Sequence, residues 1–288
     1  MKDQAESLRL RLKSIESQSF TNAIAIVSGK GGVGKSNFSL NFSISLAQKG
    51  YKVLVFDMDI GMGNLDILMG KSSDKSIVNY LNGTSGLKEI MMDGPQGIRY
   101  IAGGTGLTQL VQFDEGKLRS FIDDLHHELN QFDFLIFDMG AGVTEDSLRF
   151  LLSVNEIIVV TTPEPTSLTD AYATLKHLNM YDNNIPFYVV VNRALSEKDG
   201  KDTLKRLSDV VQKFLNKEIV SLGMLPDDRN VQQSVRNQIP FLLNSPKSEA
   251  SKALEMITAQ YVRNKSEEVN SLISHSFMSK LKRFLFER

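Results

Sequence analysis

Residues 22–36, NAIAIVSGKGGVGKS, join an apolar run to a glycine-rich turn that carries two lysines. The run from Ile24 to Val27 has the composition of a buried strand. Part of the turn has the spacing G-x-x-x-x-G-K-[ST], in which glycines allow backbone N–H groups to surround phosphate oxygens. The matching residues are Gly29, Gly34, Lys35 and Ser36. The stretch therefore predicts a nucleotide-binding P-loop between a strand and a helix.

The side chains of the turn suit a nucleoside triphosphate and its metal ion. Lys35 can reach the β- and γ-phosphates, and the hydroxyl of Ser36 can ligate Mg²⁺, which prefers oxygen ligands. The following helix is mostly apolar and ends at Gly50, so its N-terminus would face the anion. We expect the nucleotide to contact consecutive residues of the turn: Gly29, Lys30, Gly31, Gly32, Val33, Gly34, Lys35, Ser36 and Asn37.

The composition excludes several kinds of site. The 288 residues include no cysteine, so disulfides, thiolate zinc sites and thiol nucleophiles are excluded. A net charge of −1 provides no global basic field, so nucleic acid is not an expected partner. The N-terminus lacks the apolar region of a signal peptide, and no apolar stretch is long enough to span a bilayer. We therefore expect a cytoplasmic protein whose membrane contact is peripheral.

Further apolar runs along the chain end in polar or small residues. We expect strands at 51–56, 97–104, 132–138, 155–162, 185–192 and 218–224, and helices that include a short one from Ser76, one at 115–129 and a last one at 248–262. This alternation predicts an α/β fold with a mostly parallel sheet, helices on both faces and ligands at the carboxyl ends of the strands. From position alone, Asp57 and Asp59 could also be hydrogen-bonded residues of a strand exit, and Asn192 a turn residue.

Three motifs resemble those of the MinD/ParA ATPases, and the resemblance covers residues 22 to about 250. The turn KGGVGKS at 30–36 resembles the deviant Walker A motif of this family. DMDIGMGNLD at 57–66 resembles switch I, and DMGAG at 138–142 resembles Walker B with switch II. The resemblance implies a P-loop NTPase that hydrolyses ATP to ADP and phosphate with Mg²⁺ and forms a homodimer with ATP. Since cysteine is absent, the family's iron–sulfur members are excluded.

The same resemblance implies roles for single residues. The catalytic residues would be Lys30, Lys35 and Asp59. Lys30 would reach across a dimer interface to the phosphates of the other subunit, and Gly140 would sense the γ-phosphate. The metal contacts would be Ser36, Asp59 and Asp138. The purine would contact Asn192, Arg193, Pro226 and Asp227, because an asparagine amide can both donate to and accept from adenine.

Residues 1–19 form an arm that precedes the ATPase domain, for which we expect residues 20–268. Its stretch DQAESLR at 3–9 resembles the DQAxxLR element of the FlhG (YlxH) branch, which regulates flagellar number and placement. That branch implies contacts with the SRP-type GTPase FlhF, which the arm would stimulate, and with flagellar C-ring proteins. The residues facing the partner would be Asp3, Gln4, Ala5, Leu8 and Arg9. By periodicity alone, the arm could also be a solvated tail.

Residues 269–288 contain an amphipathic segment. At helical spacing, one apolar arc is formed by Ile273, Phe277, Met278, Leu281, Phe284 and Leu285. Lys282 and Arg283 lie opposite, a pattern that suits the surface of an anionic bilayer. We therefore expect reversible binding to the inner face of the cell membrane. The alternative is a terminal helix packed on the domain.

Two other functions within the family remain open at this point. A division-site ATPase of the MinD type lacks the arm. A DNA-partitioning ATPase of the ParA type would need a basic surface patch, since the net charge supplies none. A scaffold that binds nucleotide without hydrolysing it is a third possibility.

Overall fold

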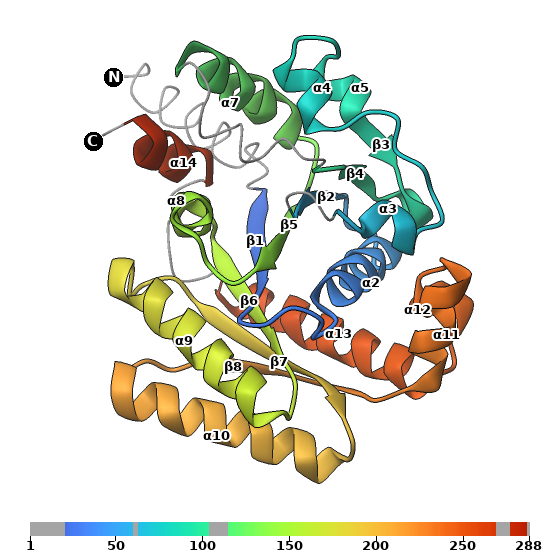
Figure 1. The fold of residues 1–288 in the computed structure, drawn as a ribbon, viewed down its shortest axis with the longest axis vertical. Helices are drawn as coiled ribbons and strands as arrows, with labels where there is room; N and C mark the ends of the chain where they lie inside the picture. The colour runs from blue at the N-terminus through green and yellow to red at the C-terminus, as the bar shows by residue number, and fades with distance from the viewer. Residues whose placement is uncertain (1–20, 60–62, 104–114, 269–276, 287–288) are drawn as a thin grey trace, which may run out of the picture.

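The computed structural model describes residues 21–59, 63–103, 115–268 and 277–286. Strands in these ranges form one eight-stranded sheet in the order β3-β4-β2-β5-β1-β6-β7-β8 (Figure 1). Neighbouring strands are parallel except for β3 and β4, which are antiparallel. This confirms the predicted α/β class. The strands are β1 (Asn22–Ser28), β2 (Val53–Met58), β3 (Met91–Asp93), β4 (Arg99–Ile101), β5 (Phe134–Ala141), β6 (Glu156–Thr161), β7 (Phe187–Ala194) and β8 (Val220–Pro226).

Helices cover both faces of the sheet (Figure 1). One face carries α2 (Lys35–Gln48), α12 (Phe241–Asn244) and α13 (Glu249–Glu268), and the other carries α7 (Glu115–Leu129), α8 (Glu145–Ser153), α9 (Pro165–Tyr181), α10 (Glu197–Leu215) and α14 (Phe277–Phe286). The remaining helical elements are α3 (Leu65–Leu68), α4 (Ile77–Leu81), α5 (Leu87–Ile90), the 3-10 turn η1 (Pro95–Gly97) and α11 (Arg229–Asn237).

Two apolar clusters hold these layers together. Side chains alternate across a strand, so Ala23 and Ala25 of β1 join the cluster under α8 and α9, whereas Ile24 and Ile26 join the cluster under α2 and α13. These four residues are completely buried. The central strand is therefore apolar on both sides, as expected for a parallel sheet with two covered faces.

The strand order brings the polar strand ends together. β5 lies between β1 and β2, and Asp57 of β2 pairs in register with Asp138 of β5. The turn after β1 leads directly into α2, so the carboxyl ends of these strands and the N-terminus of α2 meet at one edge of the sheet.

Several elements were not predicted from the sequence. α8 and α10 are absent from the expected set, although Leu204, Leu207 and Val211 of α10 have helical spacing and are buried. In the region after Ser76, the structure also contains α5 and the edge strand β3. The short elements were missed because three or four residues carry too little periodicity to identify a helix or a strand.

α14 forms within the segment expected to bind membranes. It packs against α8 and α7 (Figure 1). Its side chains Phe277, Met278 and Leu281 are buried. Of the two alternatives for the tail, the packed terminal helix is the arrangement in this structure. Ile273 lies outside the described residues, as do the side chains of Phe284 and Leu285. Within the described ranges, none of the helices has both the length and the apolar character needed to cross a bilayer.

Candidate nucleotide-binding site

The P-loop runs from the end of β1 to the start of α2, in the context that the sequence predicts. Gly32 and Gly34 have φ values of 78° and 90°, in the left-handed region that glycine adopts without strain. Gly29 has another constraint, because a Cβ there would lie 2.2 Å from the backbone carbon of Asp170 in α9. The turn therefore begins at the end of β1 and packs directly against the backbone of α9.

Lys35 and Asp138 form a buried ion pair at the base of this turn. The Nζ atom of Lys35 lies 2.7 Å from Oδ1 of Asp138, and the two side chains are 7% and 0% exposed. Ser39, one helical turn after Lys35, donates to the same Oδ1 at 2.7 Å. Sequence reasoning missed Ser39, although its i+4 spacing from Lys35 placed it on the same face of α2.

The other oxygen of Asp138, Oδ2, is buried and has no hydrogen-bond partner among the described residues. A buried carboxylate oxygen without a partner is costly, so this atom is suited to a ligand. Together with Ser36 and Asp59, it supplies the oxygen donors that Mg²⁺ prefers. These three residues therefore fit a Mg²⁺ ion, which would neutralise charge on the phosphates of a bound nucleotide.

Asp57 lies beside Asp138 and is 2% exposed. Burial, and then repulsion from Asp138, raises the pKa of Asp57 to about 7. Its Oδ1 accepts a hydrogen bond from the backbone N–H of Asp59 at 3.0 Å. Asp57 thus holds the start of the segment that carries Asp59.

Asp59 is half-buried, and burial raises its pKa above the usual value. A Cβ on Gly140 would lie 3.6 Å from Oδ1 of Asp59, so the end of β2 and the end of β5 approach each other here. The structure thus places Lys35, Asp59, Asp138 and Gly140 around one edge of the sheet.

A pocket of about 340 Å³ adjoins the P-loop. It is lined by Gly34 of the P-loop, by Asn37 of α2 and by the residues expected to contact the purine: Asn192, Arg193, Pro226 and Asp227. Val231 and Val235 of α11 line it too, and sequence reasoning did not single them out. Their i, i+4 spacing was the available signal, since it gives one helical face that can pack on a planar base.

Asn192 makes two hydrogen bonds within the protein. Its Nδ2 donates to the carbonyl of Val33 at 2.7 Å, and its Oδ1 accepts from the backbone N–H of Arg193 at 3.0 Å. Arg193 has a φ of 56°, which is uncommon for a residue other than glycine. The amide therefore contacts the P-loop as well as the pocket.

Lys30 points away from the Lys35–Asp138 pair and toward the start of α9. Its Nζ lies 3.0 Å from Oε2 of Glu164 and 3.3 Å from Oγ1 of Thr166, and its side chain is 43% exposed. The structure thus separates the two lysines of the turn. The arm residues expected to contact a partner, Asp3, Gln4, Ala5, Leu8 and Arg9, lie outside the described residues.

The P-loop between a strand and a helix, the buried Lys35–Asp138 pair and the adjoining pocket define a P-loop NTPase. A family model described as ParA, NUBPL iron-transfer P-loop NTPase, matches residues 19–262. The chain belongs to this ParA family, and it is an ATPase of the family.

Comparison with individual proteins indicates a branch of the family to which the chain is similar. The chain is 35% identical to the flagellum site-determining protein YlxH of Helicobacter pylori over 245 residues, which cover 84% of this chain and 82% of that protein. It is 30% identical over 246 residues to the antiactivator FleN of Pseudomonas aeruginosa, covering 85% of this chain and 88% of that protein. These matches confirm the resemblance to the FlhG (YlxH) branch.

A solved structure supports the same conclusion about the fold. The septum site-determining protein MinD of Pyrococcus horikoshii, complexed with Mg-ADP, superimposes with a TM-score of 0.69 and 26% sequence identity. The match covers 88% of this chain and all of that one.

Proposed function

We propose that this ATPase is a switch that binds ATP with Mg²⁺, dimerises, associates reversibly with the membrane through its tail and regulates flagellar number and placement. The Mg-ADP in the MinD structure supports the choice of ligand. The pocket beside the P-loop supports it independently, because it has room for a purine next to the predicted phosphate site.

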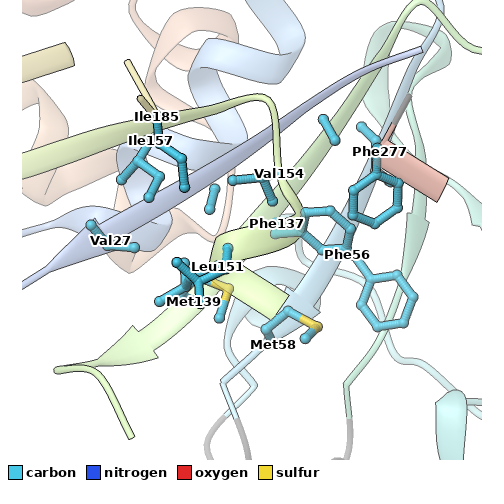
Figure 2. Close-up of a cluster of buried hydrophobic side chains, with 14 of the residues drawn as sticks. Val27, Phe56, Met58, Phe137, Met139, Leu151, Val154, Ile157, Ile185 and Phe277 are labelled. Atoms are coloured by element: carbon cyan, nitrogen blue, oxygen red, sulfur yellow. The ribbon is translucent and has the colours of Figure 1, made fainter. Parts of the chain in front are cut away.

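The observation that carries the proposal is the packing of α14 on Phe137, the residue before Asp138 in β5. The ring of Phe277 packs 5.4 Å from the ring of Phe137, which immediately precedes Asp138 in β5, and 6.3 Å from the ring of Phe150 in α8. Figure 2 shows Phe277 beside Phe137, with Phe56 of β2 next to them. A conformational change at the carboxyl end of β5 could therefore reach the tail through these aromatic contacts.

The docked helix also makes polar contacts. Lys282 pairs with Asp123 of α7 at 2.8 Å, and Lys280 donates to the carbonyl of Val154 at the end of α8 at 3.4 Å. Burial lowers the pKa of Lys280. On an anionic lipid surface, these lysines would instead contact water and lipid phosphates.

Docking and membrane binding use the same apolar residues, so the two states exclude each other. Burial of a Phe, Met or Leu side chain contributes about 1.5–3 kcal/mol in either environment. The apolar contribution is therefore similar in the two states, so nucleotide binding and dimerisation can shift the tail from one to the other. Two tails in one dimer would bind a membrane far more tightly than one, through effective concentration.

For the partners, the proposal relies on the relatives and the arm. YlxH is a flagellum site-determining protein and FleN an antiactivator. We propose that the arm stimulates the GTPase FlhF and that flagellar C-ring proteins dock on the ATPase domain.

Co-sedimentation with anionic liposomes tests the switch. The Asp59→Ala variant, in which hydrolysis is blocked, should pellet with liposomes in ATP and remain in the supernatant in ADP. Adding Phe277→Glu should abolish pelleting, because it places a charge on the apolar face.

Phe214→Glu is the matched control, since Phe214 is 63% exposed on α10 and outside the tail. It should pellet like its parent. Equal pelleting of the Phe277→Glu variant and its parent would contradict membrane binding through the tail.

A further inference from the structure

The helix that follows the Asp59 segment and the helix that lines the purine pocket end against each other. α3 begins at Leu65, shortly after Asp59, and α11 forms one wall of the pocket. Gly70 directly follows the C-cap of α3, and Gln238 is the C-cap of α11. A Cβ on Gly70 would lie 2.9 Å from the carbonyl oxygen of Gln238. The two helix ends are therefore in direct contact, although they are far apart in the chain.

Both helix ends have a fixed backbone. Gly70 and Gln238 adopt left-handed φ values of 62° and 54°. At the end of α3, the N–H groups of Gly70 and Lys71 donate back into the last turn at 3.1 and 2.9 Å. At the end of α11, those of Gln238 and Ile239 do so at 3.1 Å each. Because such bonds close a helix on a left-handed residue, a shift of either helix moves the contact between them.

The start of α3 is connected to Asp59 through Asp57. Oδ2 of Asp57 lies 3.5 Å from the backbone nitrogen of Leu65, and its Oδ1 accepts from the N–H of Asp59 at 3.0 Å. One carboxylate therefore contacts both the start of α3 and the residue expected to hold Mg²⁺. A shift of α3 changes the position of Asp59 through this group.

We propose that the contact between Gly70 and Gln238 couples the purine pocket to Asp59: a base packed on α11 fixes α3, and α3 then holds Asp59 in the position that hydrolysis requires. Gly70 and Gln238 are positioning residues in this arrangement, since neither is among the residues that line the pocket. The base thereby contributes to the rate of hydrolysis as well as to affinity. This inference rests on the proposed binding of ATP.

Adenosine separates the effect of the base from that of the phosphates. It fills the purine pocket but carries no phosphate, so it cannot act on Asp59 through Mg²⁺. In hydrogen exchange on the full chain, saturating adenosine should slow the amides of α11 and those of residues 68–71, which are hydrogen-bonded at the end of α3. We expect slowing of about fivefold, the lower end of typical coupling between sites.

Gly70→Ala should keep the slowing in α11 and lose it in α3, because the added methyl group forces the two helix ends apart. Gln238→Gly serves if this variant is unstable. Glycine frees the backbone at the end of α11, so the slowing of α3 should be lost there too.

Gly83→Ala is the matched control. Gly83 follows the C-cap of α4 with a φ of 69° and the same pair of backbone bonds, each of 2.9 Å. A Cβ there would meet no other part of the described chain within 4 Å. This variant has the same backbone strain without the collision, so it should keep the slowing at both α3 and α11.

Turnover provides a second measurement. Gly70→Ala should lower kcat for ATP about tenfold and leave the affinity for ADP within about threefold of the parent. Gly83→Ala should match the parent in both. A variant that was only destabilised would lose ADP binding together with turnover.

Three results would overturn the inference: adenosine that slows α11 but not α3 in the parent, slowing of α3 that persists in Gly70→Ala, or an unchanged kcat in that variant. If adenosine slows neither helix in the parent, the base does not bind in this pocket. The proposed nucleotide site then fails together with the coupling.

Discussion

At the scale of single residues, Asp57 links the stability of the protein to pH through its raised pKa. It is buried beside Asp138 and below the segment that carries Asp59, and its pKa of about 7 means that it is partly protonated at neutral pH. In the unfolded chain its pKa would be near 3.8. The folded protein therefore binds more protons than the unfolded chain between these two values.

The first consequence concerns stability in the absence of nucleotide. Because the folded state holds the proton, the free energy of unfolding should fall as the pH rises from about 4 to about 7, by at most about 4 kcal/mol from this group. Asp57→Asn should remove this dependence and be more stable than the parent at pH 7.5. Urea denaturation at pH 5 and pH 7.5 measures both effects.

Asp209→Asn, on the exposed side of α10, is the control and should keep the slope of the parent. If the parent and Asp57→Asn lose the same stability between the two pH values, the buried carboxyl is not the group responsible.

At the scale of elements, α14 and α8 form the contact on which the proposed switch depends. Three apolar side chains of α14 are buried, whereas its ion pair with α7 joins two exposed side chains and contributes about 0–1 kcal/mol. Apolar packing therefore determines whether the tail stays docked. Phe150 of α8 allows this to be tested without changing the tail, because it contacts Phe277 and Phe137 from the domain side.

Phe150→Ala should loosen the docked helix without changing the tail. We expect a loss of about 1–3 kcal/mol of docking free energy, less than for a fully buried phenylalanine, because Phe150 is half-buried. The variant should exchange the amides of α14 faster in hydrogen exchange and should pellet with anionic liposomes in part even without ATP.

Phe214→Ala, on α10, provides the comparison and should behave like the parent in both measurements. Slow exchange of α14 and unchanged pelleting in the Phe150→Ala variant would show that docking does not limit membrane binding.

For the whole molecule, the exposed position of Lys30 supports the proposed dimer. Its ammonium group is held by Glu164 and Thr166 on the surface and does not approach the Lys35–Asp138 pair. An exposed pair of this kind is worth little and is easily exchanged for a phosphate partner. A second subunit could therefore receive Lys30 at small cost.

We expect Lys30→Ala to lower ATP hydrolysis about 100-fold, the effect of removing one charge that stabilises the transition state. Its affinity for ATP should stay within about threefold of the parent, because the proposed phosphate target of Lys30 belongs to the other subunit. Lys201→Ala is the control, since Lys201 is likewise exposed and paired with a glutamate, Glu197.

Light scattering with the Asp59→Ala variant checks the assembly directly. Dimers should appear in ATP and monomers in ADP. Monomers in both nucleotides would rule out the dimeric switch.

The sequence predicted the fold and the edge of the sheet that carries the site, because buried strands, glycine spacing and acidic strand ends are local patterns. It could not predict that Asn192 reaches Val33, because the contact depends on how far β7 extends past β6 in three dimensions. Nor could the sequence predict whether the apolar face of α14 packs on the domain. An amphipathic helix has the same pattern whether its apolar face meets α8 or a bilayer.

The close contact between Gly29 and α9 also limits how this sequence can change. A methyl group at position 29 would collide with the backbone of Asp170, and a backbone cannot move aside as a flexible side chain can. Glu164 and Thr166, which hold Lys30, belong to the start of the same helix. Because both contacts join the turn to the same helix, a chimera that replaces the turn should replace α9 with it.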